Sequence, residues 1–370
     1  MFEDESRVLY KRNARVQEVA ARLVKEVVSV ESRVHDFLAE YEAVDRRSIE
    51  ELRDLAIWAE KNRLPGEARN IWLRILLLDG HNEQAWKRVG GRRMKGGLGL
   101  RLGNKVFSLA EFKDSGRDWR YAIEIPTAHF LVKTNANLGK ALNLAIELEA
   151  IYQIYAERIG HPIELFPFEW VPEIRIDGGG KRAPQAPVTG IDAWFDNKSN
   201  VLMVYGNKAR TYHVWRAAMD MVIHNSFRMA LGNRAGTLPV WAHEGLANGF
   251  VLGLRNTPRG LEFKQGIPHM DWFRAQAEMK EPLSIRRVFS SSQSDYGGGT
   301  NQLGYRAGAY TLVFFLMNGE DKKHREHFFD YLRSAFHGKG SLSTFGKAFP
   351  MDVETLSSEW FEFTRKTAHI

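Results

Sequence analysis

Two neighbouring stretches in the middle of the chain decide the fold: residues 212–231, YHVWRAAMDMVIHNSFRMAL, and residues 238–247, LPVWAHEGLA. The first is apolar almost all round, which predicts a largely buried helix. Its polar residues recur at intervals of three, four, four and four, so they form one narrow stripe along that helix. They are His213, Arg216, Asp220, His224 and Arg228. A stripe of this kind is typical of a solvated helix face, and that interpretation stays open.

The second stretch predicts another helix, which begins after Pro239 and carries Glu244 twenty residues after His224. Together the two stretches resemble the gluzincin zinc peptidases, the thermolysin-like clan. In that family an HExxH helix supplies two His ligands, and a later helix supplies a Glu in a context like P-x-W-x-x-E-G-x-A. The positions that match this context are Pro239, Trp241, Glu244, Gly245 and Ala247.

The zinc motif itself is degenerate, because the chain has His224-Asn225-Ser226-Phe227-Arg228 where the family has H-E-x-x-H. The resemblance implies that His224 and Glu244 occupy the first and third ligand positions. Asn225 stands in place of the general-base Glu, and a carboxamide cannot take a proton from water. Arg228 replaces the second His and, being always protonated, would satisfy Glu244 as an ion pair. The sequence therefore predicts no catalytic residue and no bound metal here.

An enzyme remains the main alternative, because a rearranged zinc site can be drawn from Asp220, His224 and Glu244. Asp220 lies one helical turn before His224, whereas His243 is expected to point about 100° away from Glu244 around its helix. The resemblance also implies a Tyr facing the site at Tyr305, for which a core position is an equal alternative. The sequence thus leaves enzymatic activity open and favours a non-catalytic protein.

The resemblance covers nearly the whole chain and extends to bacterial members of the clan in which short TPR-like helices precede the peptidase-like domain. Ser48 is a helix N-cap with Glu51 three residues on, and turns near residues 64–66 and 79–81 separate the helices that follow. We therefore expect a helical, TPR-like hairpin domain at 1–90, a basic Gly-rich β connector at 91–120 and a gluzincin-like domain at 121–370.

The fold class predicted for the chain is α+β, with a small mixed sheet and a helical C-terminal half. Alternating or short apolar runs predict strands, and a long amphipathic run predicts a helix at residues 138–159. The expected strands are 121–125, 129–133, 163–168 and 173–176, followed by a hairpin over 193–205. Residues 290–304 are expected to be a flexible connection, with a lid as the alternative.

The basic connector concentrates charge, since residues 86–120 hold ten Lys or Arg and three Asp or Glu, and their excess equals the +7 of the entire chain. One interpretation is a scaffold that binds nucleic acid or another polyanion. The residues that would bind it are Arg92, Arg93, Lys95, Arg101 and Lys105. The other interpretation is a set of short twisted strands whose polar face is basic.

The composition excludes several kinds of functional site. None of the 370 residues is cysteine, which excludes disulfides, thiolate zinc ligands and cysteine nucleophiles. No apolar run approaches the roughly 18 residues that a membrane helix needs. The N-terminus lacks an apolar signal region, so we expect a cytoplasmic protein, or an exported one if a signal sequence has been removed. The sequence favours a pseudopeptidase that binds a protein or peptide partner, with no oligomeric state indicated.

Overall fold

The computed structural model describes residues 2–3, 7–12, 15–20, 29–113, 116–165, 168, 171–179, 192–206, 209–231, 238–257, 260–279, 281–297 and 301–369. Within these ranges, the side chains of residues 2–3, 7–12, 15–18 and 227–231 lie outside the description. The chain divides into two units. Unit 1 comprises residues 1–153, 169–221 and 257–261, and unit 2 comprises residues 154–168, 222–256 and 262–370. The boundaries expected near residues 90 and 120 both lie within unit 1.

Residues 2–3, 7–12 and 15–20 form strands where a helical segment was expected. Strands β1 (Phe2–Glu3), β2 (Arg7–Arg12) and β3 (Arg15–Ala20) make a small antiparallel sheet. β-branched and aromatic residues are frequent in β2 and β3, and the register places Val8 opposite Val19. The high β propensity of valine and tyrosine favours strands over a helix, even though the segment is rich in charged residues.

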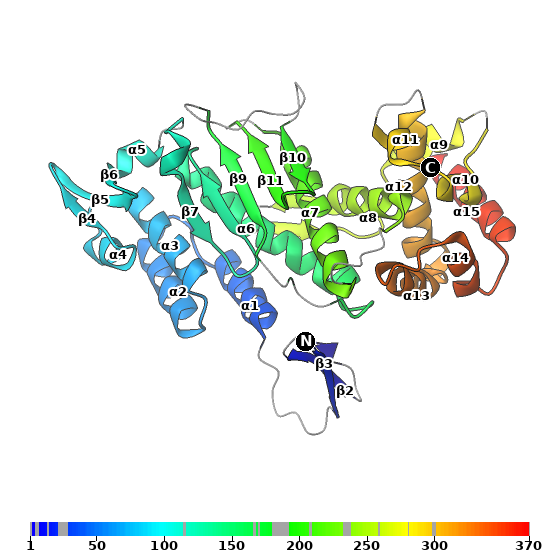
Figure 1. Ribbon diagram of the computed structural model, residues 1–370, viewed down its shortest axis with the longest axis horizontal. Coiled ribbons are helices and arrows are strands. Elements are labelled where there is room, and N and C mark those ends of the chain that lie inside the picture. Colours follow the sequence, from blue (N-terminus) through cyan, green and yellow to red (C-terminus); the bar gives the residue numbers. More distant parts are fainter. Residues whose placement is uncertain are drawn as a thin grey trace. The chain divides into compact units, whose positions relative to one another are not determined.

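Four helices follow, each beginning where the sequence offers a cap or a proline (Figure 1). They are α1 (Val30–Ala43), α2 (Ile49–Lys61), α3 (Pro65–Leu78) and α4 (Glu83–Arg88). The side chain of Ser48 accepts a hydrogen bond from the backbone N–H of Glu51, so the predicted N-cap of α2 is confirmed. Helices α2 and α3 pack against each other as the expected hairpin.

The helical hairpin docks on the edge of a sheet in the same unit. The side-chain amide of Asn70 donates to the carbonyl of Pro126 at 2.9 Å, and a carboxylate oxygen of Glu67 accepts from the backbone N–H of Ala128 at 2.7 Å. A Cβ at Gly66 would lie 2.6 Å from the carbonyl oxygen of Pro126. Because a side chain at this position would clash, only glycine lets the backbone of α3 approach this edge so closely.

The connector is a three-stranded antiparallel sheet followed by short helical turns. Its elements are β4 (Arg92–Met94), β5 (Gly97–Leu102), β6 (Lys105–Ser108), α5 (Leu109–Lys113) and a 3₁₀ turn at Trp119–Tyr121. Phe107 and Phe112 are buried, with ring centroids 6.1 Å apart. Its apolar interior makes this sheet part of unit 1 rather than an extended linker.

A mixed five-stranded sheet forms the centre of unit 1, in the order β10-β11-β9-β8-β7. The strands are β7 (Ile123–Pro126), β8 (Leu131–Thr134), β9 (Glu173–Asp177), β10 (Ala193–Asp196) and β11 (Val201–Tyr205). Strands β8, β9 and β11 are parallel, and the outer strands β7 and β10 run antiparallel to their neighbours. Helix α6 (Leu138–Tyr155) connects β8 to the rest and ends in a π-helical turn, Ala156–Gly160. Residues 163–165 do not form the expected strand.

The rest of the chain is mainly helical, so the predicted α+β class with a helical C-terminal half is confirmed (Figure 1). The elements are α7 (Thr211–Leu231), α8 (Val240–Gly253), β12 (Leu254–Thr257), β13 (Gly260–Phe263), α9 (Met270–Ala277), α10 (Ile285–Phe289), α11 (Gln293–Gly297), α12 (Gln302–Asn318), a 3₁₀ turn at Glu320–Lys322, α13 (Arg325–Phe336), α14 (Leu342–Ala348) and α15 (Val353–Ala368). Helices α8 and α12 pack closely, because a Cβ at Gly245 would collide with the carbonyl of Ala309. Among the described residues, no helix has both the length and the apolar character needed to cross a membrane.

Candidate functional site

The degenerate motif lies on α7, as the sequence predicted. Asn225 and Ser226 are buried, with 2% and 3% of their surfaces exposed, and His224 is half-buried. Burial places the Asn225 carboxamide inside the protein rather than on a solvated face. The side chain of Arg228 lies outside the described residues, so its predicted pairing with Glu244 stays a prediction.

Glu244 lies in the first turns of α8 and is 9% exposed. The side-chain amide of Asn248, one turn further on, donates to its carboxylate at 3.4 Å, which is a long hydrogen bond. Burial raises the pKa of Tyr296 to about 12, and the nearby charge of Glu244 adds to this shift. The Tyr296 ring lies 5.8 Å from that of Tyr305. Tyr296 therefore lies close both to Glu244 and to Tyr305, the residue that the resemblance places at the site.

Tyr296 also belongs to the segment at residues 290–304, which the sequence predicted to be a flexible connection or a lid. Its side chain is fully buried within α11, and its hydroxyl lies 3.1 Å from that of Ser291. The guanidinium of Arg306 donates to the Tyr296 carbonyl. Tyr296 thus anchors α11 in its own unit, while most of the other described residues of the segment are exposed. The flexible connection and the lid both stay predictions, and residues 298–300 lie outside the description.

The other members of the polar stripe find partners close to them. Arg216 forms an ion pair with Asp220 along α7, and the imidazole of His213 lies 3.3 Å from the carboxylate of Asp192. The described residues, which include Asp220, His224 and Glu244, contain no group of three His, Asp or Glu side chains placed to hold one metal ion. The geometry gives no support to the rearranged zinc site.

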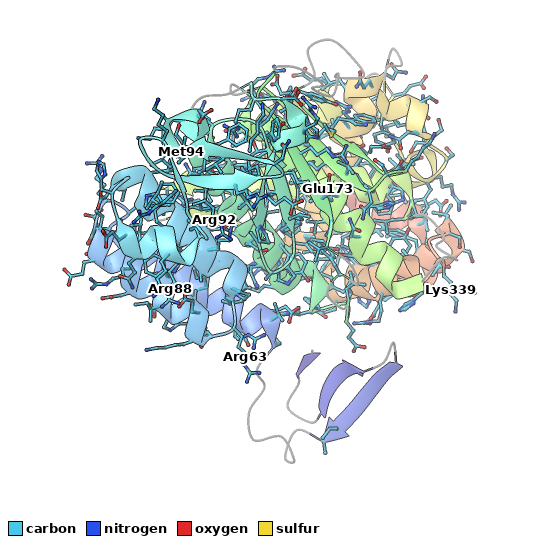
Figure 2. All side chains as sticks on the ribbon, turned by 60° about the vertical axis from the view of Figure 1, so that its left-hand side comes forward. Arg63, Arg88, Arg92, Met94, Glu173 and Lys339 are labelled. Carbon is cyan, nitrogen blue, oxygen red and sulfur yellow. The ribbon has the colours of Figure 1, made fainter. Side chains whose placement is uncertain are left out.

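The basic residues of the connector do not gather on one face of its sheet. The register pairs Arg93 with Leu98 and Lys105 with Leu102, so these basic side chains share one face. Arg92 and Arg101 pair with Gly99 and Val106 and belong to the opposite face, where Figure 2 marks Arg92 and Met94 on β4.

The individual contacts agree with this division. The ammonium group of Lys105 lies 5.2 Å from the centroid of the Tyr121 ring, which directs that side chain toward an aromatic neighbour. Lys95 is exposed in the turn between β4 and β5. The structure thus divides the five residues between two faces and a turn, which is unfavourable for a single polyanion platform.

Sequence analysis missed a buried charged cluster in unit 1, formed by Glu31, Glu67, His129 and Glu149. One ring nitrogen of His129 lies 2.7 Å from the carboxylate of Glu149, and the other lies 3.6 Å from that of Glu31. The backbone N–H of His129 also donates to Glu149, and Tyr152 stacks on the imidazole at 4.0 Å. Glu67, His129 and Glu149 are at most 5% exposed.

The pKa values within this cluster depart strongly from their ordinary range. Burial alone would lower the pKa of His129, but the charge of Glu149 and hydrogen bonds with Glu149 and Glu31 raise it to about 9. Burial and the charge of Glu149 raise the pKa of Glu67 to about 7. Burial would also raise the pKa of Glu31, but its hydrogen bond with His129 lowers it to about 2. No local motif marks these residues, because each lies in a different element.

The described residues of each unit also form a hollow that the sequence did not indicate. In unit 1, a cavity of 220 Å³ lies where α6 and the start of α7 meet β9 and β11, and is lined by Lys140, Glu147 and Trp215. The indole N–H of Trp215 donates to Glu147 at 3.2 Å, so these two polar groups satisfy each other. In unit 2, a smaller pocket of 60 Å³ lies beside α8.

Comparison with models of known protein families, with curated proteins and with solved structures finds no match to this chain.

Proposed function

We propose that this protein is a non-catalytic relative of the gluzincin peptidases that binds an extended segment of a protein partner without cleaving it. The proposal that the protein does not hydrolyse peptides is supported by Asn225, a buried carboxamide at the position where the resemblance puts the general base. A carboxamide offers no proton acceptor for an attacking water, and the general base contributes on the order of 10² to 10⁴ in rate.

The order of elements agrees with the proposed ancestry. A mixed sheet comes first, the helix that bears His224 follows it, and the helix that bears Glu244 comes next. This is the order that the resemblance implies for the sheet and the two ligand-bearing helices. His224 and the buried Glu244 stand where the resemblance puts the first and third ligands, and Arg228 stands in place of the second.

The proposed binding function rests on the position of strand β10 at one edge of the five-stranded sheet. Among the described residues it pairs only with β11, so its other edge offers backbone N–H and C=O groups to an added strand. Trp194 on this strand is 46% exposed, so its ring is accessible to a partner that pairs with the strand. Main-chain hydrogen bonds from an added strand, together with contact to one exposed aromatic residue, are how sheet edges recognise extended peptides.

Binding is tested with a fluorescein-labelled casein as an extended polypeptide, measured by fluorescence anisotropy. We expect the Trp194→Ser variant to bind about tenfold more weakly, because the exposed ring contributes apolar contact area. The matched control is Leu78→Ser, which changes another exposed apolar residue of unit 1, on α3, and is expected to leave binding unchanged. No binding, or equal losses in both variants, would contradict the assignment of β10.

The ancestry is tested by restoring the motif with Asn225→Glu and Arg228→His. If α7 and α8 retain the gluzincin arrangement, this variant presents two imidazoles one turn apart and Glu244 as the third ligand. We expect about one zinc per chain by elemental analysis, lost again when Glu244→Gln is added. A correctly folded variant that takes up no zinc would mean that His224 and Glu244 do not face each other. Cleavage of the casein by the natural chain with added zinc would overturn the non-catalytic assignment.

A further inference from the structure

Helix α8 carries three glycines one turn apart, and the middle one opens onto the pocket of unit 2. A Cβ at Gly245 would collide with the backbone of α12, and one at Gly253 would collide with the ring of Phe263. A Cβ at Gly249 would meet nothing within 4 Å. The helix is therefore in close contact at both ends of this face and uncovered at its centre, where Gly249 lines the pocket.

The walls of the pocket are apolar. Phe250, Phe263, Val313 and Phe314 are among the residues that line it. The hydroxyl of Tyr310, which also lines it, already accepts a hydrogen bond from the backbone N–H of His269. The volume of 60 Å³ is well below the roughly 150 Å³ of an engineered cavity that holds benzene. These properties suit one aliphatic side chain and exclude a nucleobase, a sugar or a fully enclosed long acyl chain.

The mouth of the pocket is positively charged. Arg158 and Lys264 both line it and are exposed. The guanidinium of Arg158 donates to the side-chain carbonyl of Gln265 at 3.2 Å, and its centre lies 6.0 Å from the centroid of the Phe263 ring, so it is held over the opening. Among the described residues, neither Arg158 nor Lys264 forms an ion pair with a carboxylate. Two cations without acidic partners beside an apolar pocket complement a ligand with a carboxylate next to an apolar group.

A third cation lies close to this opening. The guanidinium of Arg325 donates to the carbonyl of Met317, a residue of the pocket lining, at 2.7 Å. Burial lowers the pKa of Arg325, the charge of Glu326 opposes this shift, and the charge of Arg158 adds to it, which places the two guanidinium groups near each other. Their mutual repulsion is relieved when an anion binds between or beside them.

We propose that this pocket binds the free carboxyl terminus of a partner polypeptide that ends in an aliphatic residue. The terminal side chain fills the space beside Gly249, and the terminal carboxylate lies against Arg158 and Lys264. An α-carboxylate is separated from its own side chain by a single carbon, which matches charges placed at the rim of so small a pocket. The site is separate from Glu244, because five residues along α8 rotate Gly249 by about 140° away from it, and it does not depend on β10.

The test uses a fluorescein-labelled peptide, Gly-Ser-Gly-Ser-Leu, with the full-length protein and fluorescence anisotropy. We expect the free acid to bind at least tenfold more tightly than the same peptide with a C-terminal amide, because the amide removes the charge. A peptide that ends in Asp instead of Leu is expected to bind as weakly as the amide, since its side chain is charged.

Two kinds of variant assign the binding to this pocket. Gly249→Leu places a side chain in the open space and is expected to abolish binding, whereas Gly249→Ala, the matched control, adds one methyl group and is expected to reduce it less than threefold. Arg158→Gln with Lys264→Gln changes only exposed residues, so it tests the charge even where Gly249→Leu impairs folding. This double variant is expected to bind the free acid no better than the amide.

Three results would overturn the proposal. Equal binding of the acid and the amide would remove the role of the carboxylate. Undiminished binding by both the glutamine double variant and a folded Gly249→Leu variant would place the site elsewhere. Binding of octanoate, measured by calorimetry, in the absence of any binding of the free-acid peptide would assign the pocket to a lipid-like carboxylate instead.

Discussion

The two units bury carboxylates in different ways. In unit 1, the carboxylates of Glu31 and Glu149 lie on either side of the His129 ring, at 3.6 and 2.7 Å. In unit 2, Glu244 is almost as deeply buried, and its described contacts are a hydrogen bond of 3.4 Å from Asn248 and the nearby phenol of Tyr296. A buried carboxylate needs a strong partner, and in the first cluster the charged imidazole of His129 is that partner for both Glu31 and Glu149.

The difference indicates which cluster serves the fold and which serves a site. The cluster around His129 joins α1, α3 and α6 to the turn before β8, so its energy stabilises the arrangement of the helical hairpin on the sheet. Glu244 is contacted by Asn248 on its own helix and lies near Tyr296 on α11, so its printed contacts come from the neighbourhood of α8 rather than from several distant elements. We expect mutations to have larger effects on stability in the first cluster.

The largest effect is expected for His129→Leu. The change removes the cation between the carboxylates of Glu31 and Glu149, and breaking a buried charged pair costs roughly 3–5 kcal/mol. The free energy of unfolding, measured with urea near neutral pH, should fall by about that amount. His35→Leu on α1, whose side chain is 61% exposed, is the control and should change it by less than about 0.5 kcal/mol.

The next effect concerns Arg228, whose pairing with Glu244 stays a prediction. If Arg228 forms a buried ion pair with Glu244, Arg228→Met should lower the free energy of unfolding by about 3 kcal/mol. Arg216→Met on the same helix breaks the more exposed pair with Asp220 and should cost about 1 kcal/mol or less. A similar small loss in both variants would mean that Arg228 does not stabilise Glu244.

The cluster in unit 1 should also make stability depend on pH. The folded-state pKa of His129, about 9, and that of Glu67, about 7, are both raised above their unfolded values, so the folded protein binds these protons more tightly. Their contribution is therefore complete at low pH and is lost as pH rises through about 7 for Glu67 and about 9 for His129. Each group should contribute a slope of up to about 1.4 kcal/mol per pH unit within its window.

Urea unfolding at several pH values between about 5 and 9 measures this dependence. The Glu67→Gln variant should lose the decline below about pH 7 and keep the decline above it, because its amide does not titrate. Glu31 acts in the opposite sense: its lowered pKa gives stability that disappears only as pH falls toward about 2. Stability that is flat between pH 6 and 9 would contradict the proposed charge state of the cluster.

The smallest effect is expected for Asn248→Ala. The hydrogen bond that it removes is long, so the free energy of unfolding should fall by only about 0.5–1 kcal/mol. Asn70→Ala, which removes a bond of 2.9 Å to Pro126, gives a comparison in unit 1 and should cost more. A loss above about 3 kcal/mol for Asn248→Ala would mean that Glu244 depends on this amide after all.

The sequence predicted those features that depend on neighbours along the chain. The cap at Ser48, the α2–α3 hairpin, the β10–β11 hairpin and the two helices bearing His224 and Glu244 all follow from local periodicity or turns. Residues 2–20 were misjudged because charged residues concealed a pairing of short strands. The expected strand near residue 163 failed because an apolar run of that length suits a turn packed on a helix equally well.

The features that could not be predicted join distant positions. The partners of His129 come from residues 31 and 149, and nothing in either segment signals the other. The pocket of unit 2 likewise depends on which glycine of α8 remains uncovered, and that is decided by α12 and Phe263 rather than by α8 itself. The division of basic residues between two faces of the connector became clear only from its strand register.

The close approach of Gly66 to Pro126 has a consequence for the order of events while the chain is being synthesised. The helical hairpin at residues 49–78 is made from local contacts and can form as soon as it leaves the ribosome. The strand edge that receives it, at residues 126–128, is added only about fifty residues later. Until then the carboxylate of Glu67 stays hydrated, and it loses that water only when the edge arrives. Completion of unit 1 is therefore a late step that waits for the sheet.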